Sequence, residues 1–126
     1  MRKSIISRLL MFFVFATNMF AFEKPIFLLL YTDTCPHCQS FLNNTMSDIS
    51  VKNILSNFEV EAINVNKQQY VPYDIDFTGT VPSIHLLDSN HVQMANTLTG
   101  NIPAQELVPA LNKFLNLYSQ YRSSVK

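Results

Sequence analysis

The sequence has few cysteines, little charge and no extended basic run. Only 14% of its 126 residues are charged, and nine Lys and Arg balance nine Asp and Glu. The longest basic run is Arg2-Lys3, so the charge pattern that nucleic-acid binding requires is missing. Blocks of like charge are also missing and 48% of the residues are hydrophobic, which excludes a chain that is disordered throughout. The length suits one folded domain rather than two.

The first residues have the layout of a secretory signal. Arg2, Lys3 and Arg8 precede the apolar residues 9–16. This apolar stretch is shorter than the ~20 residues of a typical membrane span. The chain then becomes polar at residues 23–25.

We therefore predict a signal peptide over residues 1–21, cleaved after Ala21, and a single domain over residues 22–126. The expected location is the periplasm or an equivalent oxidising space. Met19 is larger than the residue typical of this position in a cleavage site, so an uncleaved N-terminal anchor is the alternative.

Hydrophobic patterning in the first half of the domain predicts a strand, two helices and a second strand. Residues 25–31 form a continuous apolar run, typical of a central parallel strand buried on both faces. A helix is expected from Cys35, and another after Ser50, which is a candidate N-cap. Residues 58–65 alternate as a strand does, so these elements suggest a βαβ unit.

The second half predicts a β-hairpin and a final helix. Residues 83–87 and 91–95 flank a turn at residues 88–90, with His85 and His91 expected to face solvent. Pro103 is expected in the first turn of the final helix, and Pro109 is expected to perturb its early turns. Apolar residues recur there at helical spacing: Leu107, Leu111, Phe114, Leu115 and Tyr118.

Only two cysteines are present, within Cys35-Pro36-His37-Cys38, so an exported chain of this kind cannot be a scaffold of several disulfides. The tetrapeptide follows the first strand, which places Cys35 at the N-cap of the next helix. Pro36 fits the first helical position because no N–H group is needed there. The N–H groups of His37 and Cys38 are then free to donate to the sulfur of Cys35.

These donors and the helix dipole favour the thiolate form of Cys35, which makes Cys35 the expected nucleophile. Cys38 lies one helical turn further on and is expected to be more buried, as a resolving thiol. His37 is expected to stabilise the reduced thiolate relative to the disulfide, which makes the oxidised pair a stronger oxidant.

From about residue 25 to about residue 118, the chain resembles the thioredoxin superfamily. Its Cys-Pro-His-Cys tetrapeptide is similar to that of the DsbA-type thiol oxidases, but the interval from Cys38 to Pro82 leaves no room for their helical insertion. The stretch after Cys38 resembles small exported thioredoxin-like proteins. Gly100 matches the glycine near the last strand of thioredoxins.

The resemblance implies an α/β thioredoxin-like fold, with a central mixed sheet flanked by helices. It implies that Pro82 is the cis-proline of the family and that Val81 and Pro82 shape the binding of the substrate backbone. Leu29 stands where thioredoxins have a buried acid, so proton transfer is expected to use water, Glu61 or another group.

The resemblance further implies a thiol–disulfide oxidoreductase without a cofactor. Its expected partners are protein thiol or disulfide substrates and a redox-recycling partner, which is expected in the membrane. A monomer is expected. The direction of exchange, oxidising or reducing, stays open.

Other roles of the cysteine pair compete with redox exchange. Closed zinc sites need two further ligands, and a disulfide that closes so small a loop constrains the unfolded chain little. Haem attachment needs histidine at position 39, where the chain has Gln39. The rival function is a non-enzymatic copper carrier that uses Cys35 and Cys38 as soft ligands.

Overall fold

The computed structural model describes residues 23–67 and 71–124. The predicted signal peptide over residues 1–21 and its cleavage after Ala21 lie outside these described residues. None of the helices within the described ranges is both long enough and apolar enough to cross a membrane.

Four strands form one mixed sheet in the order β2-β1-β3-β4. Their bounds are β1 (Ile26–Tyr31), β2 (Glu59–Asn64), β3 (Ser83–Leu87) and β4 (Leu98–Thr99). β1 pairs in parallel with β2 and antiparallel to β3, which in turn pairs antiparallel to β4. The strands predicted at residues 25–31, 58–65 and 83–87 are therefore confirmed to within a residue or two at each end.

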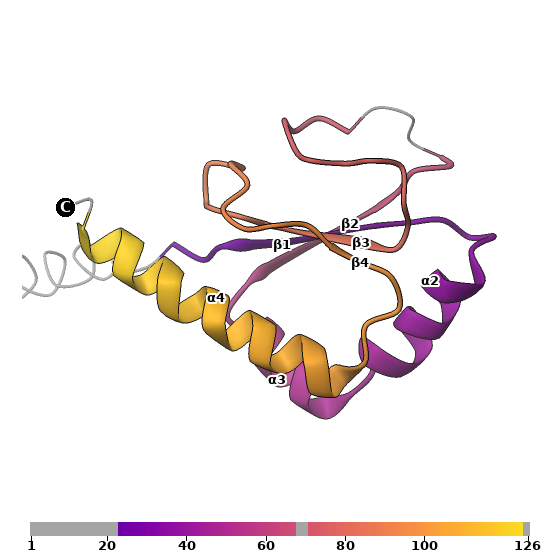
Figure 1. Cartoon of the computed structure of the whole chain (residues 1–126), viewed down its shortest axis with the longest axis horizontal. Helices are drawn as coiled ribbons and strands as arrows, with labels where there is room; N and C mark the ends of the chain where they lie inside the picture. The colour runs from indigo at the N-terminus through magenta and orange to yellow at the C-terminus, as the bar shows by residue number, and fades with distance from the viewer. Residues whose placement is uncertain (1–22, 68–70, 125–126) are drawn as a thin grey trace, which may run out of the picture.

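The helices that the structure describes lie on one face of this sheet (Figure 1). They are α2 (Pro36–Ser40), α3 (Ile49–Leu55) and α4 (Ala104–Ser124), and a π-helical turn, η1 (Phe41–Thr45), continues α2. The part of the β2–β3 connection described from residue 71 onward lies as a loop on the other face (Figure 1). Because both faces are covered, Ile26 to Leu30 of β1 are all buried, as their unbroken apolar run predicts.

Each face of the sheet has its own apolar core. On the helical side, Phe27 and Leu29 of β1 pack with the buried faces of η1, α3 and α4. On the loop side, Leu28 and Leu30 form the second core, against which residues of the 71–77 loop pack. The alternation of side chains along β1 distributes its apolar residues between the two cores.

The start of α3 differs from the sequence prediction. Asp48, rather than Ser50, is the N-cap, because its carboxylate accepts the backbone N–H of Ser50 at 2.8 Å. Ser50 is already inside the helix. Both residue types favour N-caps, and the residue that comes first along the chain takes the position.

The predicted hairpin is wrong in its second strand. Residues 91–95 contribute only an isolated bridge between Leu87 and Gln93, and β4 at Leu98–Thr99 is the true partner of β3. The Asp88 carboxylate accepts the N–H groups of Asn90 at 2.8 Å and Val92 at 3.0 Å, which tightens the turn. The chain therefore leaves the turn in a loop before it pairs again.

α4 begins at Ala104, directly after Pro103, whose carbonyl accepts the N–H groups of Glu106 and Leu107. The predicted first-turn proline thus lies just before the first helical residue. The helix continues through Pro109 to Ser124. Pro109 therefore costs one backbone hydrogen bond and does not end the helix.

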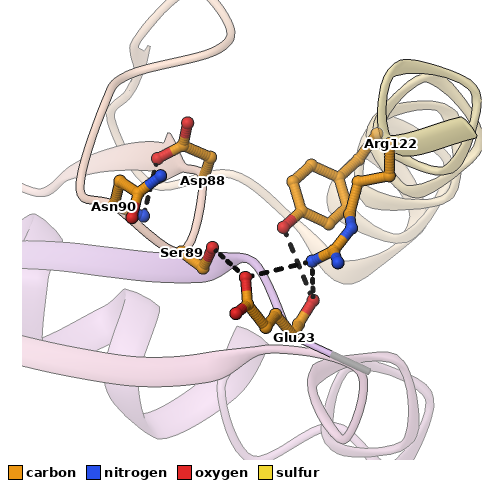
Figure 2. A network of polar contacts seen from close by, with 6 residues as sticks. Glu23, Asp88, Ser89, Asn90 and Arg122 are labelled. Carbon is orange, nitrogen blue, oxygen red and sulfur yellow. Dashed lines mark hydrogen bonds and ion pairs between the residues drawn. The ribbon is translucent and has the colours of Figure 1, made fainter. Parts of the chain in front are cut away.

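Polar contacts fasten the start of β1 to the end of α4 (Figure 2). Arg122 donates to the Glu23 carbonyl at 3.2 Å and to the Glu23 carboxylate at 3.3 Å. The same carboxylate accepts the hydroxyl of Ser89 at 2.8 Å, and the Tyr118 hydroxyl donates to the Glu23 carbonyl at 3.4 Å. These contacts tie β1, the turn after β3 and α4 together at the end of the sheet where β1 begins.

Candidate active site

Cys35 is the N-cap of α2, as the sequence predicts. Its backbone is extended, and its sulfur accepts the N–H of Cys38 at 3.1 Å. Pro36 occupies the first helical position. A backbone N–H at this position has no partner within the helix, so the N–H that proline lacks is not needed. The sulfur therefore lies at the positive end of a helix that begins where β1 ends.

The Val81–Pro82 peptide bond is cis, as the resemblance implies, and it lies against Cys35. The thiol of Cys35 donates to the Val81 carbonyl across 3.7 Å. The carbonyl of Pro82 accepts the N–H of Gly100 at 2.9 Å, and Gly100 has the positive φ of 93° that glycine adopts readily. The structure thus brings Cys35, Val81 and Pro82 together.

The loop after β4 also contacts the helix that carries the cysteines. The Asn101 amide donates to the hydroxyl of Ser40 at 3.0 Å, and the buried Thr45 hydroxyl donates to the Ile102 carbonyl at 2.6 Å. Together with the bond from Gly100 to Pro82, these contacts make residues 100–102 a bridge between α2–η1 and the Val81–Pro82 loop.

Cys38 is completely buried, one turn along the helix from Cys35. Burial, together with the hydrogen bond and charge of Cys35, raises the pKa of Cys38 to about 11. A backbone hydrogen bond from Thr32 acts in the opposite direction and is weaker than burial. At neutral pH Cys38 is therefore a protonated thiol, and the half-buried Cys35 is the accessible sulfur of the pair.

This raised pKa predicts that the reduced protein loses stability in alkaline solution. In the unfolded chain the Cys38 thiol ionises near its ordinary value of 9.0, whereas in the fold it ionises near 11. The unfolded state therefore loses its proton first, and the free energy of unfolding falls as the pH rises through this interval. We expect a loss on the order of 2 kcal/mol, measured by urea unfolding under reducing conditions.

Cys38→Ala is the matched control for this prediction, because it keeps Cys35 and removes the buried thiol. Its stability should change less than that of the wild type across the same interval. Parallel curves for the two proteins would show that another group causes the alkaline loss.

His37 lies in the first turn of α2 with its side chain exposed to solvent. The hydrogen bonds that the structure describes at the Cys35 sulfur involve Cys38 and Val81, not the imidazole. His37 is therefore adjacent to the pair along the helix, and no hydrogen bond described in residues 23–67 and 71–124 joins its imidazole to the Cys35 sulfur.

Glu61 is not placed to exchange a proton with the cysteines. It is in register with Leu28 and so lies on the loop side of the sheet, whereas Leu29, at the position of the thioredoxin acid, lies on the helical side. The contacts of its carboxylate are the Tyr73 hydroxyl at 3.3 Å and His91 at 3.7 Å. Glu61 is thus excluded as the group that exchanges protons with the cysteines, because its side chain lies on the opposite face of the sheet from Leu29.

His85 is the residue that the sequence analysis placed wrongly. It was expected to face solvent, yet it is fully buried and bonded to Ser83, Gln93 and Thr97. His91, by contrast, is only half-buried, with its ring stacked on Tyr73 at 4.2 Å. All five residues of β3 are buried, and the apolar residues that flank His85 in the sequence, Ile84 and Leu86-Leu87, were the signal that could have identified it as internal.

Nowhere in residues 23–67 and 71–124 do three His, Cys, Asp or Glu side chains gather as metal ligands would. Cys35 and Cys38 are present there as free thiols. The pair thus consists of one accessible thiol at the N-cap and one buried thiol one helical turn further on.

No model of a known protein family and no curated protein matches the chain. Solved structures do match. A thioredoxin from Thermus thermophilus is 20% identical with a TM-score of 0.58, covering 73% of this chain and 74% of that one. A disulphide isomerase from Xylella fastidiosa is 17% identical with a TM-score of 0.56, covering 73% of this chain and 79% of that one. The oxidised C-terminal domain of DsbD from Neisseria meningitidis is 17% identical with a TM-score of 0.52, covering 71% and 79%.

These similarities agree with the arrangement built up from the residues. The sheet is mixed, the helices have no large insertion between them, and the Cys-x-x-Cys pair begins the helix that follows β1. The chain therefore has the thioredoxin-like fold that its sequence predicts.

Proposed function

We propose that this protein is a thiol–disulfide oxidoreductase that exchanges disulfides with protein substrates through Cys35 and Cys38. One observation carries the proposal. The Cys35 sulfur caps a helix, accepts the Cys38 N–H at 3.1 Å and faces the Val81 carbonyl beside Pro82. An accessible sulfur is thereby held next to a backbone segment, and we propose that the chain of a protein substrate binds beside it.

In the reducing direction, the Cys35 thiolate attacks one sulfur of a substrate disulfide. A mixed disulfide forms, and the other substrate sulfur leaves as a thiolate that takes a proton from solvent. Cys38 then loses its proton and attacks the Cys35 sulfur, which releases the second substrate thiolate and leaves the Cys35–Cys38 disulfide. Two electrons have passed to the substrate, and the oxidising direction is the reverse.

The environment of Cys38 supports this order of events. Its raised pKa keeps it protonated while Cys35 makes the first attack. Two of the causes of that shift are the hydrogen bond and the charge of Cys35, and both end when the Cys35 sulfur enters the mixed disulfide. Cys38 then ionises more readily, at the step where its thiolate is needed.

The reduction potential of the pair decides the direction of exchange. It is measured by equilibrating the protein with glutathione buffers, where each ~30 mV corresponds to ~1.4 kcal/mol. A potential near −120 mV, as in DsbA, identifies a disulfide donor, and one near −270 mV, as in thioredoxin, identifies a reductase.

The proposal is tested by the reduction of insulin disulfides beside a titration of the reduced protein with Cu(I). Catalysed reduction, lost in the absence of a thiol reductant, supports the oxidoreductase. Tight copper retention without any catalysed exchange contradicts it and favours a carrier that uses the same two thiols.

We also propose that the chain acts in an oxidising compartment, where a membrane-bound redox protein recycles the pair. The charged and apolar pattern of residues 1–16 supports export. Fractionation of cells that express the full chain, with N-terminal sequencing of the product, tests this. A product that starts after Ala21 in the exported fraction is expected, and an intact product in the cytoplasm contradicts the proposal.

His37 gives a further prediction, on the redox potential. We expect His37→Pro to make the pair less oxidising by several tens of mV, because a cationic or donor side chain next to the pair stabilises the thiolate. Proline is tolerated in the first helical turn, and His37→Gly is a second variant of the same kind. The measurement is the glutathione equilibrium.

Asn43→Ala is the control for His37, since Asn43 is an exposed residue of the same helical segment outside the tetrapeptide. Its potential should equal that of the wild type. An unchanged potential in both His37 variants would refute the role given to the imidazole.

A further inference from the structure

A buried polar cluster lies beneath the loop that leads to the Val81–Pro82 bond. Its centre is His85, in the middle of β3, with no exposed surface. The imidazole Nε2 lies 3.0 Å from the Ser83 hydroxyl. Nδ1 lies 3.2 Å from the amide oxygen of Gln93 and 3.3 Å from the Thr97 hydroxyl. Both ring nitrogens are therefore bonded inside the protein.

Gln93 and Thr97 hold the loop by its backbone. The N–H of Asp76 donates to the Gln93 amide oxygen at 3.0 Å, and the Thr97 hydroxyl donates to the Asp76 carbonyl at 3.0 Å. The Gln93 amide nitrogen donates to the Ala95 carbonyl at 2.8 Å and to Thr97 at 2.9 Å. Side chains thus give this loop the hydrogen bonds that a neighbouring strand gives in a sheet.

The imidazole of His85 connects the two ends of the loop segment formed by residues 76–82. At one end, Gln93 and Thr97 link the imidazole to the backbone of Asp76. At the other end, the imidazole bonds to Ser83, which directly follows Pro82. The ring of Phe77 meets His85 edge-on, with the ring centres 6.3 Å apart.

The partners of the cluster fix Nδ1 of His85 as a hydrogen-bond donor. The Nδ1–H group donates to Gln93, whose amide nitrogen is already occupied as a donor. In the neutral imidazole, Nε2 is unprotonated and accepts the hydroxyl of Ser83. A neutral imidazole therefore has a partner for each ring nitrogen, and the Thr97 hydroxyl, whose proton goes to the Asp76 carbonyl, is a longer second contact of Nδ1.

We propose that neutral His85 is a positioning residue, which holds residues 76–82 on the sheet and so keeps Val81 and Pro82 against Cys35. Protonation of His85 releases this segment and weakens the capture of protein substrates, so that exchange is suppressed in acid. This inference rests on the proposed thiol–disulfide exchange.

The charges around the imidazole support a neutral state. The partners within hydrogen-bond distance are neutral groups, and the acidic side chain whose charge acts on the imidazole is Asp76 on the loop. Glu61 shares a row of the sheet with Leu28 and His85 and is already in contact with His91. Burial lowers the pKa of His85 below its ordinary value of 6.5, against the smaller opposing effects of Gln93 and Asp76. A charged imidazole would have no carboxylate within hydrogen-bond distance, so burying its charge costs free energy that opening of the cluster relieves.

Hydrogen exchange of the Asp76 amide tests the release directly, in the absence of any substrate. In the wild type we expect its protection factor to fall about tenfold or more between about pH 7 and about pH 5, while amides of β1 stay protected. In His85→Gln, whose side chain does not titrate, the Asp76 protection factor should be independent of pH. A protection factor that stays constant in the wild type, or falls equally in His85→Gln, would overturn the proposal.

Thr97→Val is the second variant, because it removes only the hydroxyl that holds the Asp76 carbonyl. It should lower Asp76 protection already at neutral pH and retain the fall in acid. If His85→Gln does not fold, this variant and the wild type decide the outcome, since neither replaces the imidazole. If the protection of the Asp76 amide at neutral pH is the same in Thr97→Val as in the wild type, the Thr97 hydroxyl does not hold the loop and the proposal is contradicted.

A kinetic ratio tests the consequence for exchange. The rate of insulin reduction is divided by the rate at which iodoacetamide alkylates Cys35, because both depend on the thiolate and only the first needs the Val81–Pro82 loop. The ratio should fall several-fold on acidification of the wild type and stay level in His85→Gln. Leu87→Val, a buried change on the same face of β3, controls for lost stability and should follow the wild type.

The two proposals fail in different ways. If insulin is not reduced at any pH, the proposed function is wrong, while Asp76 protection still reports on the loop. If insulin is reduced and the ratio is independent of pH, the function stands and the role of His85 is wrong.

Discussion

Replacement of Cys35 by serine is expected to reduce disulfide exchange to the uncatalysed rate, a loss on the order of a thousandfold or more. Cys35 is the accessible sulfur of the pair and faces Val81, whereas Cys38 has no exposed surface. A hydroxyl at position 35 is far less acidic and cannot form the mixed disulfide. Insulin reduction measures the loss.

Cys38→Ser should have a different effect, since it leaves the attacking sulfur in place. The first attack then occurs and resolution does not, so covalent complexes with substrate should accumulate and run as larger species on non-reducing gels. The double variant, which lacks both sulfurs, should form none. Full turnover in either single variant would contradict the assigned roles.

Phe27→Ala is expected to cause the largest loss of stability. Phe27 is fully buried in β1, and its ring packs edge-on against Phe58 with centres 6.1 Å apart. Truncation of such a side chain costs about 3–5 kcal/mol, a large part of the ~5–15 kcal/mol that holds a typical domain folded. Urea unfolding measures the change.

Val60→Ala is the matched control, because Val60 is in register with Phe27 on the neighbouring strand and is 48% exposed. It removes apolar carbon from the same row of the sheet without leaving a cavity in the core, so its loss should be below about 1 kcal/mol. Equal losses in the two variants would show that the packing at Phe27 is not what holds β1.

The prediction of the candidate site from sequence succeeded where the chemistry is local. Cys35, Pro36 and Cys38 lie within one helical turn, so the position of the sulfur at the cap follows from residue types and their spacing. The cis bond at Pro82 has no local signal of this kind, because most bonds before proline are trans. It was predicted through the resemblance, and the structure confirms it.

The errors arose where side chains compete with backbone pairing. Residues 91–95 have an apolar pattern suited to a strand, yet Asp88 tightens the preceding turn and Gln93 turns inward to hold Asp76. His85 was assigned to solvent because a polar residue in a hairpin usually faces outward. Its burial depends on partners from loops that are distant in the sequence, and periodicity does not report them.

By itself the sequence determined the buried strand β1 and the helix that Cys35 caps, with Cys38 one turn further on, because strand burial and helix capping depend on neighbouring residues. Only the tertiary structure decided that Val81 contacts Cys35 and that Glu61 lies on the loop side of the sheet. It also decided that His85 is buried and bonded to Ser83, Gln93 and Thr97. The physical reason is that these contacts join segments whose relative placement depends on strand order and loop packing, which no local pattern encodes.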